Sequence, residues 1–98
     1  MKYEVSKELY EAVTGEDTGD IFEIYYKPRI DFDTFFFKCK EWALSQYEYD
    51  CIATRYIKGK QWECIIEDGY TSPIIAKADT EQQAVFDACE YIRKELLK

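Results

Sequence analysis

Four cysteines are the side chains best suited to nucleophilic or metal chemistry in this chain of 98 residues, which has no histidine. A thiol nucleophile usually needs a neighbouring base, most often histidine, and a zinc site here would need all four thiolates or carboxylates. The cysteines form no Cys-x-x-Cys pair, and each lies in an apolar pattern where a thiol packs as a small hydrophobic side chain. We therefore predict no cysteine catalysis, no metal site and no cofactor at Cys39, Cys51, Cys64 and Cys89.

Paired acids are the second group that could do chemistry, because one carboxyl with a raised pKa can act as a general acid. All the pairs fall at predicted helix caps or turns, where carboxylates accept backbone hydrogen bonds. No glycine-rich loop that would hold a phosphate precedes a helix. The sequence therefore predicts a protein that is not an enzyme, and it assigns a structural role to Asp31/Asp33, Glu48/Asp50 and Glu67/Asp68.

A basic and aromatic cluster falls at a predicted hairpin tip, where it could hold phosphate and stack a base. The net charge of −7 opposes binding to nucleic acid and to anionic membranes. A double-stranded RNA-binding domain carries lysine or arginine at the start of its last helix, where they contact phosphates. This chain has Asp79 and Glu81 there instead. Nucleic acid is therefore not the expected partner, and a small nucleotide-like ligand is the alternative for Arg55, Tyr56, Lys58, Lys60 and Trp62.

The elements that position these groups follow from periodicity and caps, and the length predicts one domain over residues 1–98. Ser6 and Asp79-Thr80 are typical helix N-caps, and Gly59 suits a tight turn between two strands. We expect an α+β fold in the order α-β-α-β-β-β-α, with helices packed on an antiparallel β-meander. The predicted helices are 7–13, from Asp31 or Asp33 to Ser45, and one from Thr80 to the end; the predicted strands are 21–27, 47–57, 61–67 and 74–78.

Three features of these elements concern the packing. The strand prediction at 21–27 places Phe22, Ile24 and Tyr26 on one face. In the following helix Phe37 falls outside the apolar stripe, so it either fills a wide groove in the core or forms an exposed patch for a partner. In the last helix Tyr91 is expected to widen the buried stripe.

Two stretches resemble small phage-encoded proteins of the phage α-β-α sandwich domain family. The first is the acid-capped helix Asp31-Phe-Asp-Thr-Phe-Phe-Phe-Lys-Cys-Lys-Glu-Trp42, and the second is Ala76-Lys-Ala-Asp-Thr-Glu-Gln-Gln-Ala-Val-Phe-Asp-Ala-Cys89. With the meander between them they cover about two thirds of the chain. The three phenylalanines before Trp42 depart from the small residues expected there. The resemblance implies a phage accessory protein and assigns no catalytic residues.

The sequence-based hypothesis is a small non-enzymatic phage accessory protein, located in the cytoplasm of the host cell, that binds a host protein, with inhibition of a defence component as the expected effect. The absence of an apolar run after Met1 and of a membrane-length apolar window leads to that expectation of location. Two alternatives are a binder of a nucleotide-like ligand and a homo-oligomer that uses Phe37 and Leu44. Charge reversal at Asp31 and Asp33 is expected to weaken the partner complex and to leave folding nearly unchanged. The expected protein-binding residues are Glu23, Tyr25, Asp31, Asp33, Phe37 and Tyr70.

Overall fold

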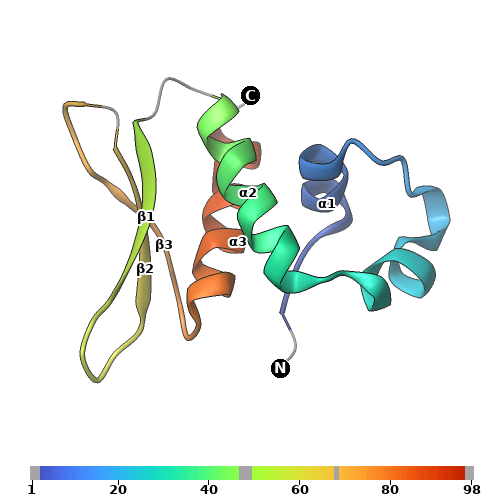
Figure 1. The fold of residues 1–98 in the computed structure, drawn as a ribbon, viewed down its shortest axis with the longest axis horizontal. Helices are drawn as coiled ribbons and strands as arrows, with labels where there is room; N and C mark the ends of the chain where they lie inside the picture. The colour runs from blue at the N-terminus through green and yellow to red at the C-terminus, as the bar shows by residue number, and fades with distance from the viewer. Residues whose placement is uncertain (1–2, 47–49, 68, 97–98) are drawn as a thin grey trace.

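The computed structural model describes residues 3–46, 50–67 and 69–96 of the chain. The described residues form a three-stranded antiparallel sheet with helices on one side of it (Figure 1), so the α+β prediction is confirmed. The helices are α1 (Lys7–Thr14), α2 (Phe32–Gln46) and α3 (Glu81–Tyr91), and the strands are β1 (Cys51–Tyr56), β2 (Trp62–Glu67) and β3 (Ile74–Ala78). Short 3-10 or π-helical turns occupy Gly19–Ile21, Phe22–Tyr26, Lys27–Arg29 and Ile92–Leu96.

The sheet is a meander in the order β1-β2-β3. The turn between β1 and β2 contains Gly59 at a φ of 72°, a backbone conformation that glycine adopts without strain. Tyr56 pairs with Trp62 at that end of the β1–β2 ladder, and a β-bulge at Cys64 and Ile65 shifts the register against β3. Of the strand predicted at 47–57, residues 47–49 lie outside the described residues, and β1 covers 51–56, so that Asp50 and Ile57 flank it.

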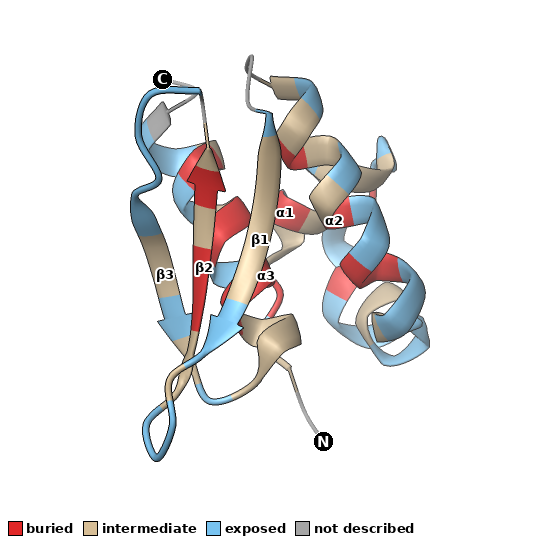
Figure 2. Cartoon of the chain, turned by 60° about the vertical axis from the view of Figure 1, so that its left-hand side comes forward, coloured by how far each residue is buried: buried red, intermediate tan, exposed pale blue. Residues whose placement is uncertain are grey.

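The core lies between α3 and the sheet, with α2 packed beside α3 and α1 packed on α2. Figure 2 shows that most buried positions gather on the helices and on β2, the central strand. Small side chains on α3, including Ala84 and Ala88, are completely buried, so this helix lies close to its neighbours. Phe86 fills the space beside them and packs against Tyr3 and Phe35, with ring centroids 5.7 and 5.5 Å away.

The strand predicted at 21–27 is wrong: this segment forms helical turns between α1 and α2. The β-forming residues suggested a strand, but Phe22 and Tyr26 lie on one side of a helical turn and both pack on Tyr10 of α1. Ile24 points away from that contact and is 77% exposed, whereas the strand placed it on the same face as Phe22. Tertiary contact with α1 therefore outweighs the local preference for strand.

Three further side chains correct or settle the predicted packing. Phe37 is 62% exposed, so the account in which it fills a groove in the core is wrong, and its role towards a partner stays a prediction. Tyr91 is 42% exposed and does not widen the buried stripe of α3. Glu63 of β2, although charged, is only 7% exposed, because Arg55 and Lys77 flank it on the neighbouring strands. In the part of the chain that the structure describes, every helix is too short or too polar to cross a membrane.

Candidate functional site

An exposed apolar surface lies on the segment between α1 and α2, residues 15–31, which we call the lobe. Ile21 and Tyr25 are each 49% exposed, and Ile24 is 77% exposed. Apolar side chains scattered singly over a surface are ordinary, but three within five residues of one helical turn form a patch. The lobe projects from the helical side of the molecule, at the opposite end from the sheet (Figure 1).

Aromatic packing holds the lobe against α1. Phe22 is 2% exposed, and its ring centroid lies 5.5 Å from that of Tyr10. Tyr10 also contacts Tyr26 at 5.9 Å and Phe35 of α2 at 5.7 Å. Burial raises the pKa of the Tyr10 hydroxyl above its usual value, and the nearby charge of Glu16 adds to the shift. This cluster joins the lobe to both helices, so the exposed patch rests on an ordered base.

Polar contacts fix the start of the lobe. Gly15 ends α1 in the left-handed conformation, with a φ of 78°, and donates its backbone N–H to the carbonyl of Glu11. The Glu11 carboxylate accepts hydrogen bonds from the backbone N–H of Thr18 at 2.7 Å and from its hydroxyl at 2.8 Å. These bonds favour the charged carboxylate and lower the pKa of Glu11. The loop after α1 is therefore held in one conformation.

The charge of the lobe is negative, since residues 15–31 contain five acids and two bases. Both bases are already engaged. Arg29 stacks on the ring of Tyr25 at 4.1 Å and donates to its carbonyl at 2.8 Å, and Lys27 lies 3.3 Å from the carboxylate of Glu23. Acids such as Asp20 therefore border the apolar patch, and the net charge of this border is negative.

The structure divides the predicted protein-binding residues between two ends of the molecule. Glu23 and Tyr25 belong to the lobe, Asp31 is its last residue, and Asp33 and Phe37 follow it on α2. The connection between β2 and β3, which carries Tyr70, lies at the far end of the molecule (Figure 1), and Tyr70 is 95% exposed there. One surface cannot include both groups. The sequence analysis did not assign Ile21 and Ile24 to this surface. A helical interpretation of residues 19–26, in which Phe22 and Tyr26 lie four residues apart on one buried side, would have predicted that these two isoleucines are exposed.

Asp31 has a structural role that limits its use as a probe. Its carboxylate accepts hydrogen bonds from the backbone N–H groups of Asp33 at 3.1 Å and Thr34 at 3.3 Å, and from the Thr34 hydroxyl at 3.1 Å. These are N-cap bonds for α2, and losing such a cap costs about 1 kcal/mol. The expectation that reversing both acids leaves folding unchanged therefore needs correction at Asp31. Asp33 is exposed and remains a usable probe of the surface.

The alternative ligand site at the hairpin is largely engaged in contacts within the chain. Arg55 lies 2.7 Å from the carboxylate of Glu63, and the ring of Trp62 packs on that of Tyr56 at 5.4 Å. Lys58 and Lys60 are exposed at the tip. A cleft of about 590 Å³ lies near the hairpin and is lined by other residues, which include Gln61, Lys77, Thr80, Gln83 and Asp87. The structure therefore does not gather the five predicted residues around a pocket.

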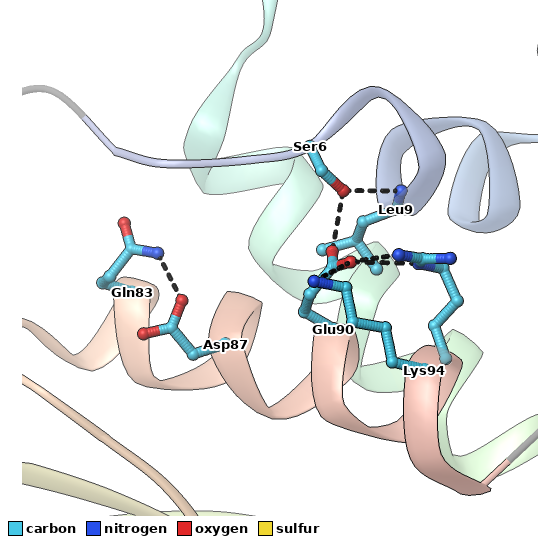
Figure 3. A network of polar contacts seen from close by, with 7 residues as sticks. Ser6, Leu9, Gln83, Asp87, Glu90 and Lys94 are labelled. Carbon is cyan, nitrogen blue, oxygen red and sulfur yellow. Dashed lines mark hydrogen bonds and ion pairs between the residues drawn. The ribbon is translucent and has the colours of Figure 1, made fainter.

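A polar network on α3 forms a second candidate (Figure 3). The carboxylate of Glu90 accepts from Ser6 at 2.7 Å and from Nε of Arg93 at 3.1 Å, while Lys94 lies 3.7 Å away. Burial by itself would raise the pKa of Glu90, but the bonds from Arg93 and Ser6 outweigh it and lower the pKa. Asp87, one turn earlier, has a pKa raised by burial. Both carboxyls line a cleft of about 300 Å³.

Two carboxyls with opposite pKa shifts are a pattern found in acid–base catalysis, but here the network has a tethering role. Ser6 is the N-cap of α1, with its hydroxyl oxygen accepting from the backbone N–H of Leu9 at 3.0 Å. Gln83 adds a second tie, because its amide both donates to the carbonyl of Glu4 at 2.9 Å and accepts from its N–H at 2.7 Å. The network therefore fastens the N-terminal segment to α3.

Replacing Glu90 with glutamine should lower the free energy of unfolding by about 1–3 kcal/mol, since hydrogen bonds to a charged group are lost. The folded pKa is lowered from 4.5, so the contribution is present above that pH and is lost as pH falls through the folded pKa. Urea denaturation of wild type and Glu90→Gln at several pH values measures the difference in the free energy of unfolding. The titration of Asp87 affects both proteins equally and drops out of that difference. Lys94→Ala is the control, with a change below about 0.5 kcal/mol expected. A difference that does not change with pH would assign the effect to packing instead of charge.

Comparisons of this chain with protein-family models, with curated proteins and with solved structures find no match. The resemblance to the phage α-β-α sandwich family therefore stays a prediction, and the function rests on the geometry of the lobe.

Proposed function

We propose that this chain is a non-enzymatic phage accessory protein that binds a host protein through the lobe and blocks it, with a component of host defence as the candidate target. The observation that carries the proposal is Ile24, which is 77% exposed on a turn whose neighbour Phe22 is 2% exposed. A large aliphatic side chain held in water by an otherwise anchored turn is suited to insertion into a pocket on a partner.

The lobe also suits binding energetically. Phe22, Tyr10 and the Glu11–Thr18 bonds order the turn before any partner arrives, so association costs less conformational entropy. The acids around the patch favour a partner with a basic rim, since complementary charge speeds association and fixes orientation. The partner's expected surface is thus an apolar pocket bordered by lysine or arginine.

The cysteines support a binding role over nucleophilic catalysis. Cys39, Cys64 and Cys89 are completely buried. Burial raises the pKa of Cys64 to about 12, so this thiol stays protonated at neutral pH and is a poor nucleophile. Cys51 is more accessible, but a hydrogen bond to the Glu67 carboxylate raises its pKa as well.

Replacing Ile24 with aspartate should abolish capture of the partner, because it removes the central apolar side chain and adds a charge that a pocket would have to desolvate. The test compares tagged wild type and Ile24→Asp as baits in host lysate, with bound proteins identified by mass spectrometry. A protein recovered by wild type and lost with the variant is then titrated in purified form. We expect its affinity to fall by about 100-fold or more.

One control variant and one further test variant make the comparison specific. Tyr70→Ser changes a side chain that is 95% exposed at the far end of the molecule, and it should leave the partner bound. Asp33→Lys tests the acidic border without removing a cap, and it should weaken binding by a smaller factor that shrinks as salt is added. Equal binding by wild type and Ile24→Asp would remove the lobe as the docking surface.

A further inference from the structure

One face of the sheet carries no helix in the described part of the chain. α2 and α3 pack on the other face, and Figure 2 looks onto the open one. Side chains alternate between the faces of a strand, and those at Ile52, Cys64 and Ile66 belong to the helix side. The open face therefore presents Cys51, Ala53 and Arg55 of β1, and Glu63, Ile65 and Glu67 of β2.

Antiparallel pairing arranges the open face in rows that run across the strands. One row is basic: Arg55 of β1 and Lys77 of β3 flank Glu63 of β2 at 2.7 and 3.9 Å. Two cations on one carboxylate leave this row with a net positive charge. The side chains of Arg55 and Lys77 are 55% and 53% exposed, so they can reach a further anion above the sheet.

The remaining two rows are apolar and acidic. Ala53, Ile65 and Ile74 are register partners and form the middle row, in which Ile74 is 41% exposed. Beyond it the thiol of Cys51 donates to the carboxylate of Glu67 at 3.3 Å, so the third row has a net negative charge. The open face is thus basic on one side of an apolar stripe and acidic on the other.

Such a face is complementary to itself. In a face-to-face pair of identical sheets, a two-fold axis must lie in the interface. If the axis runs along the apolar row, the stripe meets its own copy and the basic row of each protomer lies over the acidic row of the other. If the axis runs along the strands, like charges meet. Charge therefore selects one arrangement, an aligned sandwich of two sheets about 10 Å apart.

We infer that the open sheet face binds a second copy of this chain, with a two-fold axis along the Ala53–Ile65–Ile74 row and Glu67 of each copy over the Arg55–Glu63–Lys77 row of the other. Three strands of five or six residues make a face of only about 15 by 20 Å. That is smaller than the roughly 800 Å² which each partner buries in a typical stable interface. The dimer is therefore weak and reversible. The lobe lies at the opposite end (Figure 1), so both lobes stay free and the dimer is bivalent.

A charge-swap experiment tests this arrangement. Glu67→Lys places a lysine over a row of net positive charge, and Lys77→Glu gives that row a net negative charge under the native Glu67. Each variant therefore opposes like charges twice in a homodimer and should weaken self-association by about tenfold or more. In an equimolar mixture of the two variants, the introduced lysine meets the introduced glutamate in one contact and the two native residues meet in the other. Dimerisation should then return to within a few-fold of wild type. Sedimentation velocity over a concentration series up to millimolar measures this at physiological ionic strength, where the Debye length is about 8 Å and limits the repulsion between two acidic chains.

Two further variants and a thiol-labelling measurement keep the test decisive. Ile65→Ser removes the centre of the stripe without changing charge and should also give monomers, while circular dichroism checks that each variant is folded. Glu23→Lys on the lobe changes the net charge by the same amount as Glu67→Lys and should not weaken the dimer. Cys51 lies within the interface, so its labelling by a thiol reagent should slow as protein concentration rises. A wild type that is monomeric at millimolar concentration overturns the inference, and so does a dimer that Ile65→Ser and both charge variants leave intact.

Discussion

Replacing Phe86 with alanine is expected to lower the free energy of unfolding by about 3–5 kcal/mol, which is the usual cost of emptying a buried phenylalanine site. Phe86 is 1% exposed and lies where the N-terminal segment, α2 and α3 meet. Its ring packs against Tyr3 at 5.7 Å, Phe32 at 6.0 Å and Phe35 at 5.5 Å. A domain of this size typically has a stability near 5–10 kcal/mol, so the variant loses a large share of it.

Urea denaturation followed by circular dichroism measures this loss. Tyr91→Ala is the matched control, because it removes an aromatic ring from the same helix at a position that is 42% exposed, and its cost should stay below about 1 kcal/mol. Phe86→Leu should cost about 1–2 kcal/mol, since most of the volume is kept. If Phe86→Ala and Tyr91→Ala were equally stable, the central position of Phe86 in the core would be wrong.

Replacing Phe22 with alanine should release the lobe and leave the rest of the domain folded. Phe22 is 2% exposed and packs on Tyr10, which lies at the edge of the core around Phe86. Removing the ring costs about 3 kcal/mol or more of packing. Because the aromatic contacts of Phe22 and Tyr10 join the lobe to α1 and α2, outside the sheet, we expect this loss to appear as local opening.

Hydrogen exchange measured by mass spectrometry distinguishes local from global loss. Amides of residues 19–30 should exchange about 100-fold faster in Phe22→Ala, while those of β2 and α3 keep their protection. Ile24→Ala is the control, since its side chain is exposed and its removal should leave lobe exchange unchanged. The released lobe should also bind the partner more weakly, because the ordering entropy is then lost on association. Faster exchange in β2 and α3 as well would show that the lobe and the core unfold as one unit.

The local signals of the sequence were sufficient for most of the fold. Ser6 does cap α1, and Thr80 caps α3 by accepting from the backbone N–H of Gln83 at 3.2 Å. Gly59 occupies the turn between β1 and β2, as the alternation on either side predicted. Each of these features depends on residues within a few positions of one another, which is why sequence patterns detect them.

The candidate site was predicted only in part. Glu23 and Tyr25 were assigned to a binding surface, and they do lie on the lobe. Ile24, the most exposed of its apolar side chains, was assigned to the same face as Phe22 by an alternation that the segment does not follow. Tyr70 was grouped with residues at the other end of the molecule, because no local pattern reports distance between segments.

By itself, then, the sequence determined the α+β class, the meander, the helix caps and the acidic character of the surface, all of which depend on neighbouring residues or on composition. Tertiary structure alone decided that residues 19–29 coil into turns, since Phe22 and Tyr26 pack there on Tyr10 of α1 and strand preferences span only about 1 kcal/mol. It also decided that Glu63 is buried between two bases and that one sheet face stays open, because register and helix placement bring together residues that are distant in the chain.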